Sequence, residues 1–349
     1  MKTLLRLLLK NQHQRNRSGP DQTEKGMTLV ELLVGSIMAF LIITPMLTFV
    51  VDMLNTDRRE QVKSNTEQDL QAAADFIFQD LSQAIYIYDG KGITDIKTQL
   101  PNNGDSNRTP ILVFWKRQQI KNSLPVNATL TPKPSNCNPA ALPGKAGECN
   151  DTFVLSLVAY YQIKDTTPNL TWCQPSGDNC PSRIARYEIR EPIKNPYTTD
   201  ATKPYYDATD LNDGQKGSDA FNKDFDFSKP TVNVTTGVNF PTTPEVLVNY
   251  IDHSSNTNVP VPTGAQCKTL LGVIPPPAPA TFNENDLLIT DGSTHSFYAC
   301  VDTSNNLARV TIRGNSLRRL QTDANFKTTS SAFFPITTVQ VKGLGAVGK

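Results

Sequence analysis

The sequence has almost no excess of charge of either sign. Its 349 residues carry 34 Lys and Arg against 33 Asp and Glu, which gives a formal net charge of +1. This balance argues against a protein that coats nucleic acid, an acidic solvating tail or a polybasic membrane sensor. With 19 Gly and 25 Pro and no period, a collagen-like or wholly disordered chain is also excluded. The length allows one large domain or two ordinary ones.

Motifs that carry catalysis are missing as well. The sequence has no G-x-S-x-G, Walker A, G-x-G-x-x-G or H-E-x-x-H pattern. It has no C-x-x-C pair, and only His253 and His295 could help the cysteines to bind zinc. One polar stretch fails the spacing of an EF-hand, which favours a solvated loop but leaves calcium binding open; its residues are Asp207, Asp210, Asn212, Asp213, Asp219, Asp224 and Asp226. We therefore expect no enzymatic activity, no cofactor and no metal.

The sequence has one long apolar run, which covers residues 27–51 and has Glu31 as its only charge. As a helix this run would be about 37 Å long, enough to cross a bilayer. Six basic residues precede it, which predicts that the N-terminal stretch stays in the cytoplasm and that the chain beyond is exported. A cleaved secretory signal fits poorly, because its apolar part has only about 7–15 residues.

A plain membrane anchor explains the length of the run but not its carboxylate. An ionised Glu in a bilayer costs about 2.5–3.5 kcal/mol, and the run contains no basic residue as a partner. Residues 25–33 (KGMTLVELL) resemble the class III signal of type IV pilins and pseudopilins. The resemblance implies cleavage between Gly26 and Met27, N-methylation of Met27, and pairing of Glu31 with the terminal amine of a neighbouring subunit. Cleavage would thus create the missing positive charge.

The length of the chain narrows this resemblance to the large minor pseudopilins. Segments at 58–61, 80–89, 113–117, 310–315 and 333–335 are similar to the cyanobacterial pseudopilins of hormogonium polysaccharide secretion. That similarity implies a structural filament component that supports exopolysaccharide secretion and gliding motility. The implied partners are a prepilin peptidase/N-methylase, other pilins and pseudopilins, an inner-membrane assembly platform, the lipid bilayer and the exported polysaccharide. The implied location is the inner membrane, crossed once, with the C-terminal domain in the periplasm.

The helix is predicted to continue beyond the run, because apolar residues recur at spacings of three and four from Leu70 to Tyr88. Asp80 and other polar residues fall largely on the opposite face, and Asp89 and Gly90 end the helix. Strand-like runs separated by long polar loops follow at 111–117, 153–163, 184–190, 245–250, 287–290, 296–301, 307–313 and 334–341.

These elements predict an α+β fold, in which a long N-terminal helix packs on an antiparallel β-sheet domain with long loops. The expected organisation is a removed leader at 1–26, a transmembrane half of the helix at 27–51 and an amphipathic half at 52–89. The exported β-rich domain is expected at 90–349, with an irregular insertion near 192–244.

All six cysteines lie beyond the apolar run. An even number on the exported side predicts disulfides formed in an oxidising compartment. Six cysteines allow 15 connectivities, of which nearest-neighbour pairing is favoured. It joins Cys137 to Cys149, Cys173 to Cys180 and Cys267 to Cys300.

The alternative function is a membrane-anchored periplasmic protein that binds or processes glycans. Paired carboxylates acting on a glycan have no fixed spacing in sequence. Four aromatic residues are candidates for contact with sugars, although packing is the more ordinary role for each; they are Trp115, Tyr160, Tyr161 and Trp172.

Overall fold

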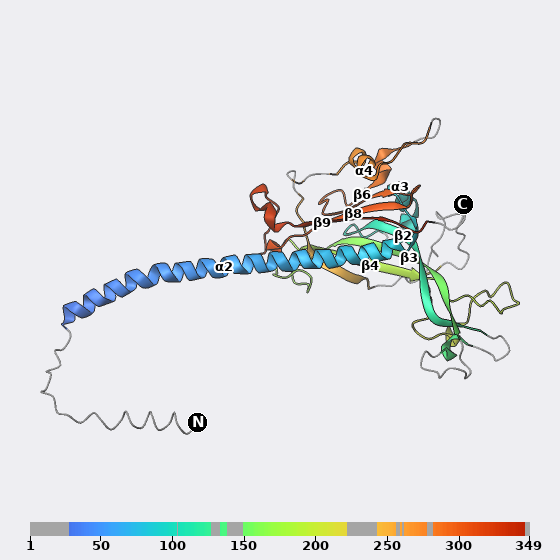
Figure 1. The fold of residues 1–349 in the computed structure, drawn as a ribbon, viewed down its shortest axis with the longest axis horizontal. Coiled ribbons are helices and arrows are strands. Elements are labelled where there is room, and N and C mark those ends of the chain that lie inside the picture. Colours follow the sequence, from blue (N-terminus) through green and yellow to red (C-terminus); the bar gives the residue numbers. More distant parts are fainter. Residues whose placement is uncertain are drawn as a thin grey trace, which may run out of the picture. The chain divides into compact units, whose positions relative to one another are not determined.

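The computed structural model describes residues 28–102, 104–126, 133–137, 149–221, 243–255, 259, 262–277 and 282–345. The chain divides into two compact units, Met1–Asp57 and Arg58–Lys349. Figure 1 shows a long helix, α2 (Leu29–Ser82), and two antiparallel sheets. The α+β class with a long N-terminal helix is therefore confirmed, and a second sheet is added to the single one expected.

The first half of α2 lies in the first unit, and every described residue from 28 to 57 is exposed. The helix continues through Pro45. Its hydroxyl groups turn back onto the backbone: Ser36 donates to the Leu33 carbonyl and Thr44 to the Phe40 carbonyl, both at 2.8 Å. These bonds remove donors from an otherwise apolar surface. By length and composition, α2 is a helix that could cross a membrane.

The second half of α2 buries the face that the sequence predicts, formed by Leu70, Ala73, Ala74, Ile77 and Leu81. The predicted end at residue 89 is wrong, since the helix ends at Ser82 and the chain enters strand β1 (Ala84–Ile87). The apolar residues at 84, 85 and 88 keep a helical spacing by coincidence. The β-branched and aromatic residues Ile85, Tyr86 and Ile87 suit a strand, and pairing of Tyr86 with Trp115 of the next strand decides the outcome.

The larger sheet has five strands in the order β1-β2-β3-β4-β5, all antiparallel. After β1 its strands are β2 (Arg108–Pro125), β3 (Cys149–Lys164), β4 (Ser182–Arg190) and β5 (Glu245–Ile251). The smaller sheet has the order β6-β7-β8-β9. Its strands are β6 (Leu288–Thr290), β7 (Phe297–Asp302), β8 (Leu307–Arg313) and β9 (Ile336–Lys342). The eight predicted strands are present as β2 to β9, and β1 was not predicted.

Both sheets and the buried face of α2 contribute to one hydrophobic core. Short helices connect the strands: α3 (Gly90–Ile96), α4 (Gly264–Leu271), and the 3₁₀ turns η1 (Lys97–Gln99), η3 (Pro134–Asn136), η4 (Ala208–Asp210), η5 (Glu284–Leu287), η6 (Leu317–Arg319) and η7 (Thr328–Phe333). Helix α4 was missed, although its capping box of Thr263 and Gln266 and its terminating Gly272 are visible in the sequence.

The expected insertion at 192–244 is more structured in its first part than predicted. Ile193, Tyr206 and Leu211 pack with Val154 of β3 in a second small core. An isolated bridge pairs Lys194 with Tyr205. Residues 222–242 lie outside the described residues, and with them Asp224 and Asp226.

Three disulfides join the cysteines in the predicted nearest-neighbour pairs. The bonded pairs are Cys137–Cys149, Cys173–Cys180 and Cys267–Cys300. All six cysteines are accounted for by these bonds, and all lie in the second unit.

Candidate functional site

The start of α2 carries the carboxylate that the sequence singles out. Glu31 accepts hydrogen bonds from the Thr28 backbone N–H at 3.1 Å and from the Thr28 hydroxyl at 3.0 Å. The Glu31 N–H in turn donates to the Thr28 hydroxyl at 3.4 Å. This is a capping box, which satisfies the otherwise unpaired donors of a first helical turn. Gly26 and Met27, the predicted processing residues, lie outside the described residues.

The Glu31 carboxylate has room for a further, charged donor. Each of its oxygens can accept more than one hydrogen bond, and charge-assisted bonds are the stronger kind. Along the described part of α2 the first basic residue is Arg58, which is 27 positions away, or about 40 Å at 1.5 Å per residue. The described part of α2 therefore offers Glu31 no positive partner within reach.

The surface around and beyond Glu31 is apolar. Eighteen large apolar side chains between Leu29 and Leu54 are exposed. Each such side chain is worth about 1.5–3 kcal/mol when it is removed from water, so this surface is far larger than a soluble monomer leaves bare. A surface of this kind is a weak sign of membrane anchoring.

A second charged site, which sequence reasoning missed, lies at the other end of α2. Asp80 was assigned to the polar face, but it is only 7% exposed. Its Oδ1 accepts from Lys116 Nζ at 2.8 Å, and its Oδ2 accepts from Tyr160 Oη at 2.6 Å and Arg186 Nε at 2.7 Å. These three donors come from the middle strands of the larger sheet, so one carboxylate fixes the last turn of the helix onto three strands.

The positive charges around Asp80 keep its buried carboxylate ionised. Burial alone would raise the pKa of Asp80, but Arg186 and Lys116 hold it below its ordinary value through their charges and hydrogen bonds. Burial raises the pKa of Tyr160, and the neighbouring Asp80 raises it further, so the phenol remains a donor. Glu188 joins the cluster through Arg186 Nη2 at 2.7 Å. The arrangement positions α2 and buries no charge without a partner of opposite sign.

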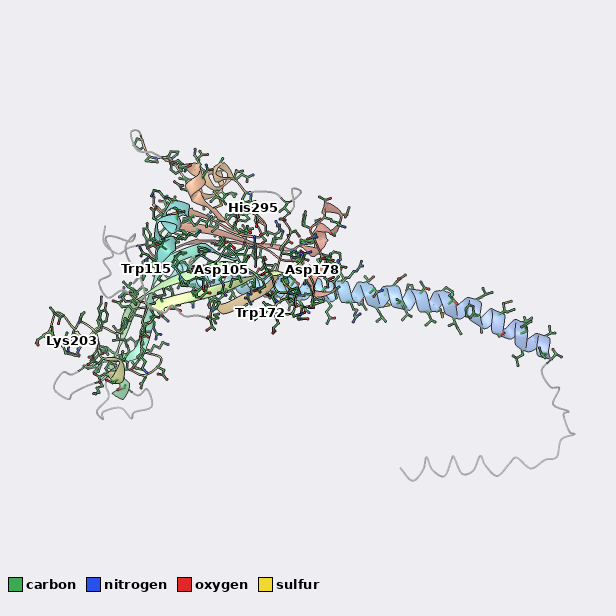
Figure 2. The ribbon with its side chains drawn as sticks, turned by 180° about the vertical axis from the view of Figure 1, so that it is seen from behind. Asp105, Trp115, Trp172, Asp178, Lys203 and His295 are labelled. Carbon is green, nitrogen blue, oxygen red and sulfur yellow. A yellow bond between two sulfur atoms is a disulfide. The ribbon has the colours of Figure 1, made fainter. Side chains whose placement is uncertain are left out.

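The aromatic residues considered for sugar binding have different surroundings (Figure 2). Trp115 is 1% exposed and donates from Nε1 to Tyr88 Oη at 3.0 Å. Tyr160 and Tyr161 are also buried, whereas Trp172 is 38% exposed. Packing is therefore the role of three of the four, and Trp172 alone among them has an exposed side chain.

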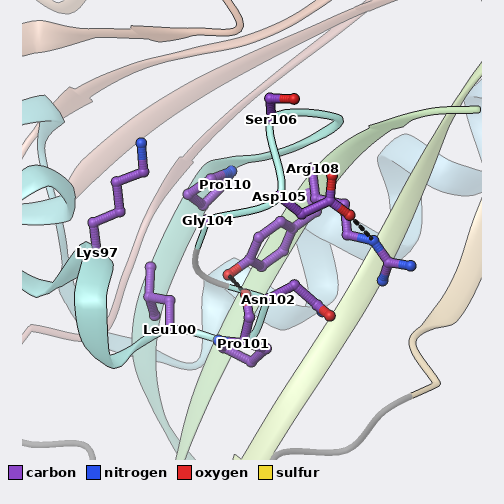
Figure 3. Close-up of a pocket in the computed structure, with 10 residues that line it drawn as sticks. Lys97, Leu100, Pro101, Asn102, Gly104, Asp105, Ser106, Arg108 and Pro110 are labelled. Carbon is purple, nitrogen blue, oxygen red and sulfur yellow. Dashed lines mark hydrogen bonds and ion pairs between the residues drawn. The ribbon is translucent and has the colours of Figure 1, made fainter.

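A small hollow lies where η1 meets the start of β2 (Figure 3). Its volume is about 210 Å³, below the roughly 300–1,000 Å³ of typical ligand pockets. Arg108 Nε binds Asp105 Oδ2 at 3.0 Å, and Arg108 Nη1 and Asn102 Nδ2 both donate to Tyr187 Oη. These polar groups bind one another at the rim of the hollow.

The candidate metal residues do not converge. Within the described ranges, no group of three or more His, Cys, Asp or Glu side chains is arranged to hold a metal ion. Asp210 pairs with Lys133 and Asp213 with Lys216. His295 lies 2.9 Å from the Thr290 hydroxyl through its Nδ1.

Comparison with protein-family models finds none that matches this chain. No curated protein and no solved structure matches it either. The pilin-like resemblance therefore depends on the residues of the chain itself, above all on 25–33.

Proposed function

We propose that this protein is a minor pseudopilin, a structural subunit of a filament related to type IV pili and type II secretion systems. The observation that carries the proposal is the exposed apolar half of α2, with a carboxylate four residues beyond the expected mature terminus at Met27. A bilayer covers such a helix before assembly, and neighbouring helices of the same kind cover it afterwards.

Glu31 is the group that distinguishes an assembling helix from an anchor. After cleavage at Gly26, the new ammonium of one subunit and the Glu31 carboxylate of its neighbour attract each other strongly, since the surroundings have a low dielectric constant. The capping box with Thr28 keeps the carboxylate hydrogen-bonded until that partner arrives.

The same proposal assigns the two units to different compartments. The basic residues before the span remain cytoplasmic, the span crosses the inner membrane once, and the second unit lies in the periplasm. The three disulfides support an oxidising location for that unit. The scattered similarity to polysaccharide-secretion pseudopilins supports a filament that serves exopolysaccharide export and motility, with the assembly platform and other pseudopilins as partners.

Glycan binding by a membrane-anchored protein is the second candidate. The observation that favours it is the exposed ring of Trp172, which an Arg183 guanidinium approaches to 5.1 Å. Because one aromatic ring is a small platform for a polymer, the structural role is the stronger proposal.

The processing step is tested by the mass of the mature N-terminus. We expect the full chain, co-expressed with a prepilin peptidase, to lose residues 1–26 and to gain one methyl group on Met27. A Gly26→Val variant should keep its leader, because the peptidase requires a small residue there if the resemblance holds. A mature terminus at any residue other than 27 would contradict the proposal.

The role of Glu31 is tested by two substitutions with different effects on the cap. Glu31→Ala removes both the cap and the charge, whereas Glu31→Gln keeps a capping side chain and removes only the charge. We expect both variants to insert in the membrane and to be lost from the filament in cross-linking assays. Asp52→Ala, on the same exposed half of the helix, should assemble normally. Normal incorporation of Glu31→Gln would rule out charge pairing.

A further inference from the structure

His253 follows strand β5, and its side chain is partly buried. Both ring nitrogens are buried, and neither has a hydrogen-bond partner among the residues that the structure describes. A neutral imidazole tolerates such a site better than an imidazolium, whose two N–H groups and charge require partners. The surroundings therefore favour the uncharged ring.

A permanent cation is buried in the same region. Arg318 of η6 is 0% exposed. Its Nε donates to the Asn179 carbonyl at 2.7 Å and its Nη2 lies 3.7 Å from Cys173 Sγ. Its Nη1 is buried, and in the described part of the chain it has no hydrogen-bond partner. The acceptors that bind the guanidinium directly are thus neutral, while Asp323 interacts with its charge from nearby.

Asn315 joins the segment that carries His253 to the one that carries Arg318. Its Oδ1 accepts from the Arg318 N–H at 3.1 Å, and its Nδ2 donates to Asp252 Oδ1 at 3.4 Å. Burial is the main cause that lowers the pKa of His253, and the positive charge of Arg318 lowers it further. The carboxylates of Asp252 and Asp323 raise the pKa again, but it stays below its usual value. Asp252 is already engaged by Arg313 Nε at 2.9 Å.

These residues anchor the loop that the Cys173–Cys180 disulfide closes. From β5, Asn249 Nδ2 donates to the Trp172 carbonyl at 3.2 Å, and Tyr250 Oη donates to the Gln174 carbonyl at 3.0 Å. From η6, Arg318 binds the other side of the loop at Asn179. Trp172 and Asp178 mark this loop in Figure 2. The loop is thus held by β5 on one side and by η6 on the other, and Asn179 Nδ2 also donates to Asp323 Oδ1 at 3.0 Å.

We propose that His253 is an acid-sensitive anchor for this disulfide loop. Protonation of His253 gives a partly buried ring a charge and two N–H groups that have no acceptor among the described residues, and separation of β5 from η6 lets water reach them. The loop then loses its contacts on both sides, while the disulfide remains intact. Release of the loop changes the exposed surface around Trp172 and leaves the hydrophobic core folded.

The direction of the pH dependence follows from linkage. The pKa of His253 is lowered while the loop is attached and returns toward its ordinary value of about 6.5 when the loop is released. The neutral ring therefore stabilises the attached loop fully above about pH 6.5, and this stabilisation is lost as the pH falls below that value. Each unit by which the pKa is lowered makes loop release about tenfold easier once the ring is protonated.

The two tryptophans of the chain allow a direct test. The full chain in detergent micelles, labelled with 5-fluorotryptophan, should give two ¹⁹F resonances, one from Trp172 in the loop and one from Trp115 in the core. We expect the Trp172 resonance to change between about pH 8 and about pH 5 with an apparent pKa below 6.5, while the Trp115 resonance stays fixed. Trp172→Phe assigns the two signals.

Substitution of the histidine separates this mechanism from general acid effects. His253→Gln should abolish the Trp172 titration, and His253→Leu, which suits a dry site, provides a second variant if Gln is not tolerated. His295→Asn is the matched control, because Asn accepts the positive φ of 48° at that position, and it should titrate like the wild type. A Trp172 signal that does not change with pH, a joint change of both tryptophans, or a titration that persists without His253 would overturn the proposal.

Discussion

Asp80 holds the end of α2 by charge, whereas the residues around it hold the helix by apolar contact. Its partners Lys116 and Arg186 lie 36 and 106 residues away in sequence. A carboxylate near the C-terminus of a helix is unfavourable for the helix dipole, so the two cations also offset a local cost. The three hydrogen bonds to the Asp80 carboxylate fix the rotation of α2 about its axis and its distance from the larger sheet. Apolar contacts alone would fix both less precisely.

Loss of this charge should be costly. Asp80→Asn preserves the shape of the side chain and leaves Lys116 and Arg186 facing each other, so we expect the free energy of unfolding to fall by about 3–5 kcal/mol. Asp75→Asn, whose carboxylate lies on the exposed side of the same helix, should change it by less than about 0.5 kcal/mol. Chemical denaturation of the full chain in detergent measures both.

Asp80 also leads us to expect that the folded protein loses stability at low pH. Because the pKa of Asp80 is lowered in the folded protein, its contribution is complete above about pH 4 and is lost as the pH falls through the folded value. The Asp80→Asn variant should lack this acid-sensitive step. Equal stability of the two proteins at neutral pH would show that the ion pairs contribute nothing.

At the scale of elements, the docked half of α2 depends on a close approach to the end of β8. A Cβ at Gly314 would lie 2.8 Å from Thr66 Cγ2 and 2.9 Å from Leu70 Cδ1. Thr66 and Leu70 are both buried on the helix face that meets the core. A glycine at this position therefore sets how near the helix can lie.

Substitution at Gly314 should push the helix outward. We expect Gly314→Val to reduce the free energy of unfolding by about 1–3 kcal/mol, with a smaller effect for Gly314→Ala. Hydrogen exchange at the backbone amides of residues 66–81 should be faster in each variant, and the increase should be larger for the variant that loses more free energy of unfolding. A Cβ at Gly214 would meet no other part of the described chain within 4 Å. Gly214→Val is therefore the control for the effect of replacing glycine by a β-branched residue where no neighbour is displaced. Unchanged exchange in Gly314→Val would refute the close-packing account.

Periodic patterns were the part of the fold that could be predicted. The long helix and eight strands follow from spacings of three to four and of two, which are local properties of the sequence. Strand β1 was missed because its four residues continued the helical spacing, and the decisive pairing with β2 is not local. Asp80 and His253 could not be placed for the same reason, since their partners come from strands and turns distant in sequence. No sequence signal predicted those contacts.

At the scale of the whole molecule, the position of the disulfides bears on how the protein responds to force. The bonded cysteines are separated by 12, 7 and 33 residues, so each bond closes a local loop within the second unit. None of these covalent loops includes any part of α2. In the proposed filament the subunit would be loaded along α2, and no disulfide cross-links the segment from α2 through β2. Resistance to extraction would therefore come from non-covalent contacts of α2, among them those of Asp80, the Asp69–Arg319 ion pair and the apolar face, and reducing agents should leave that mechanical threshold unchanged.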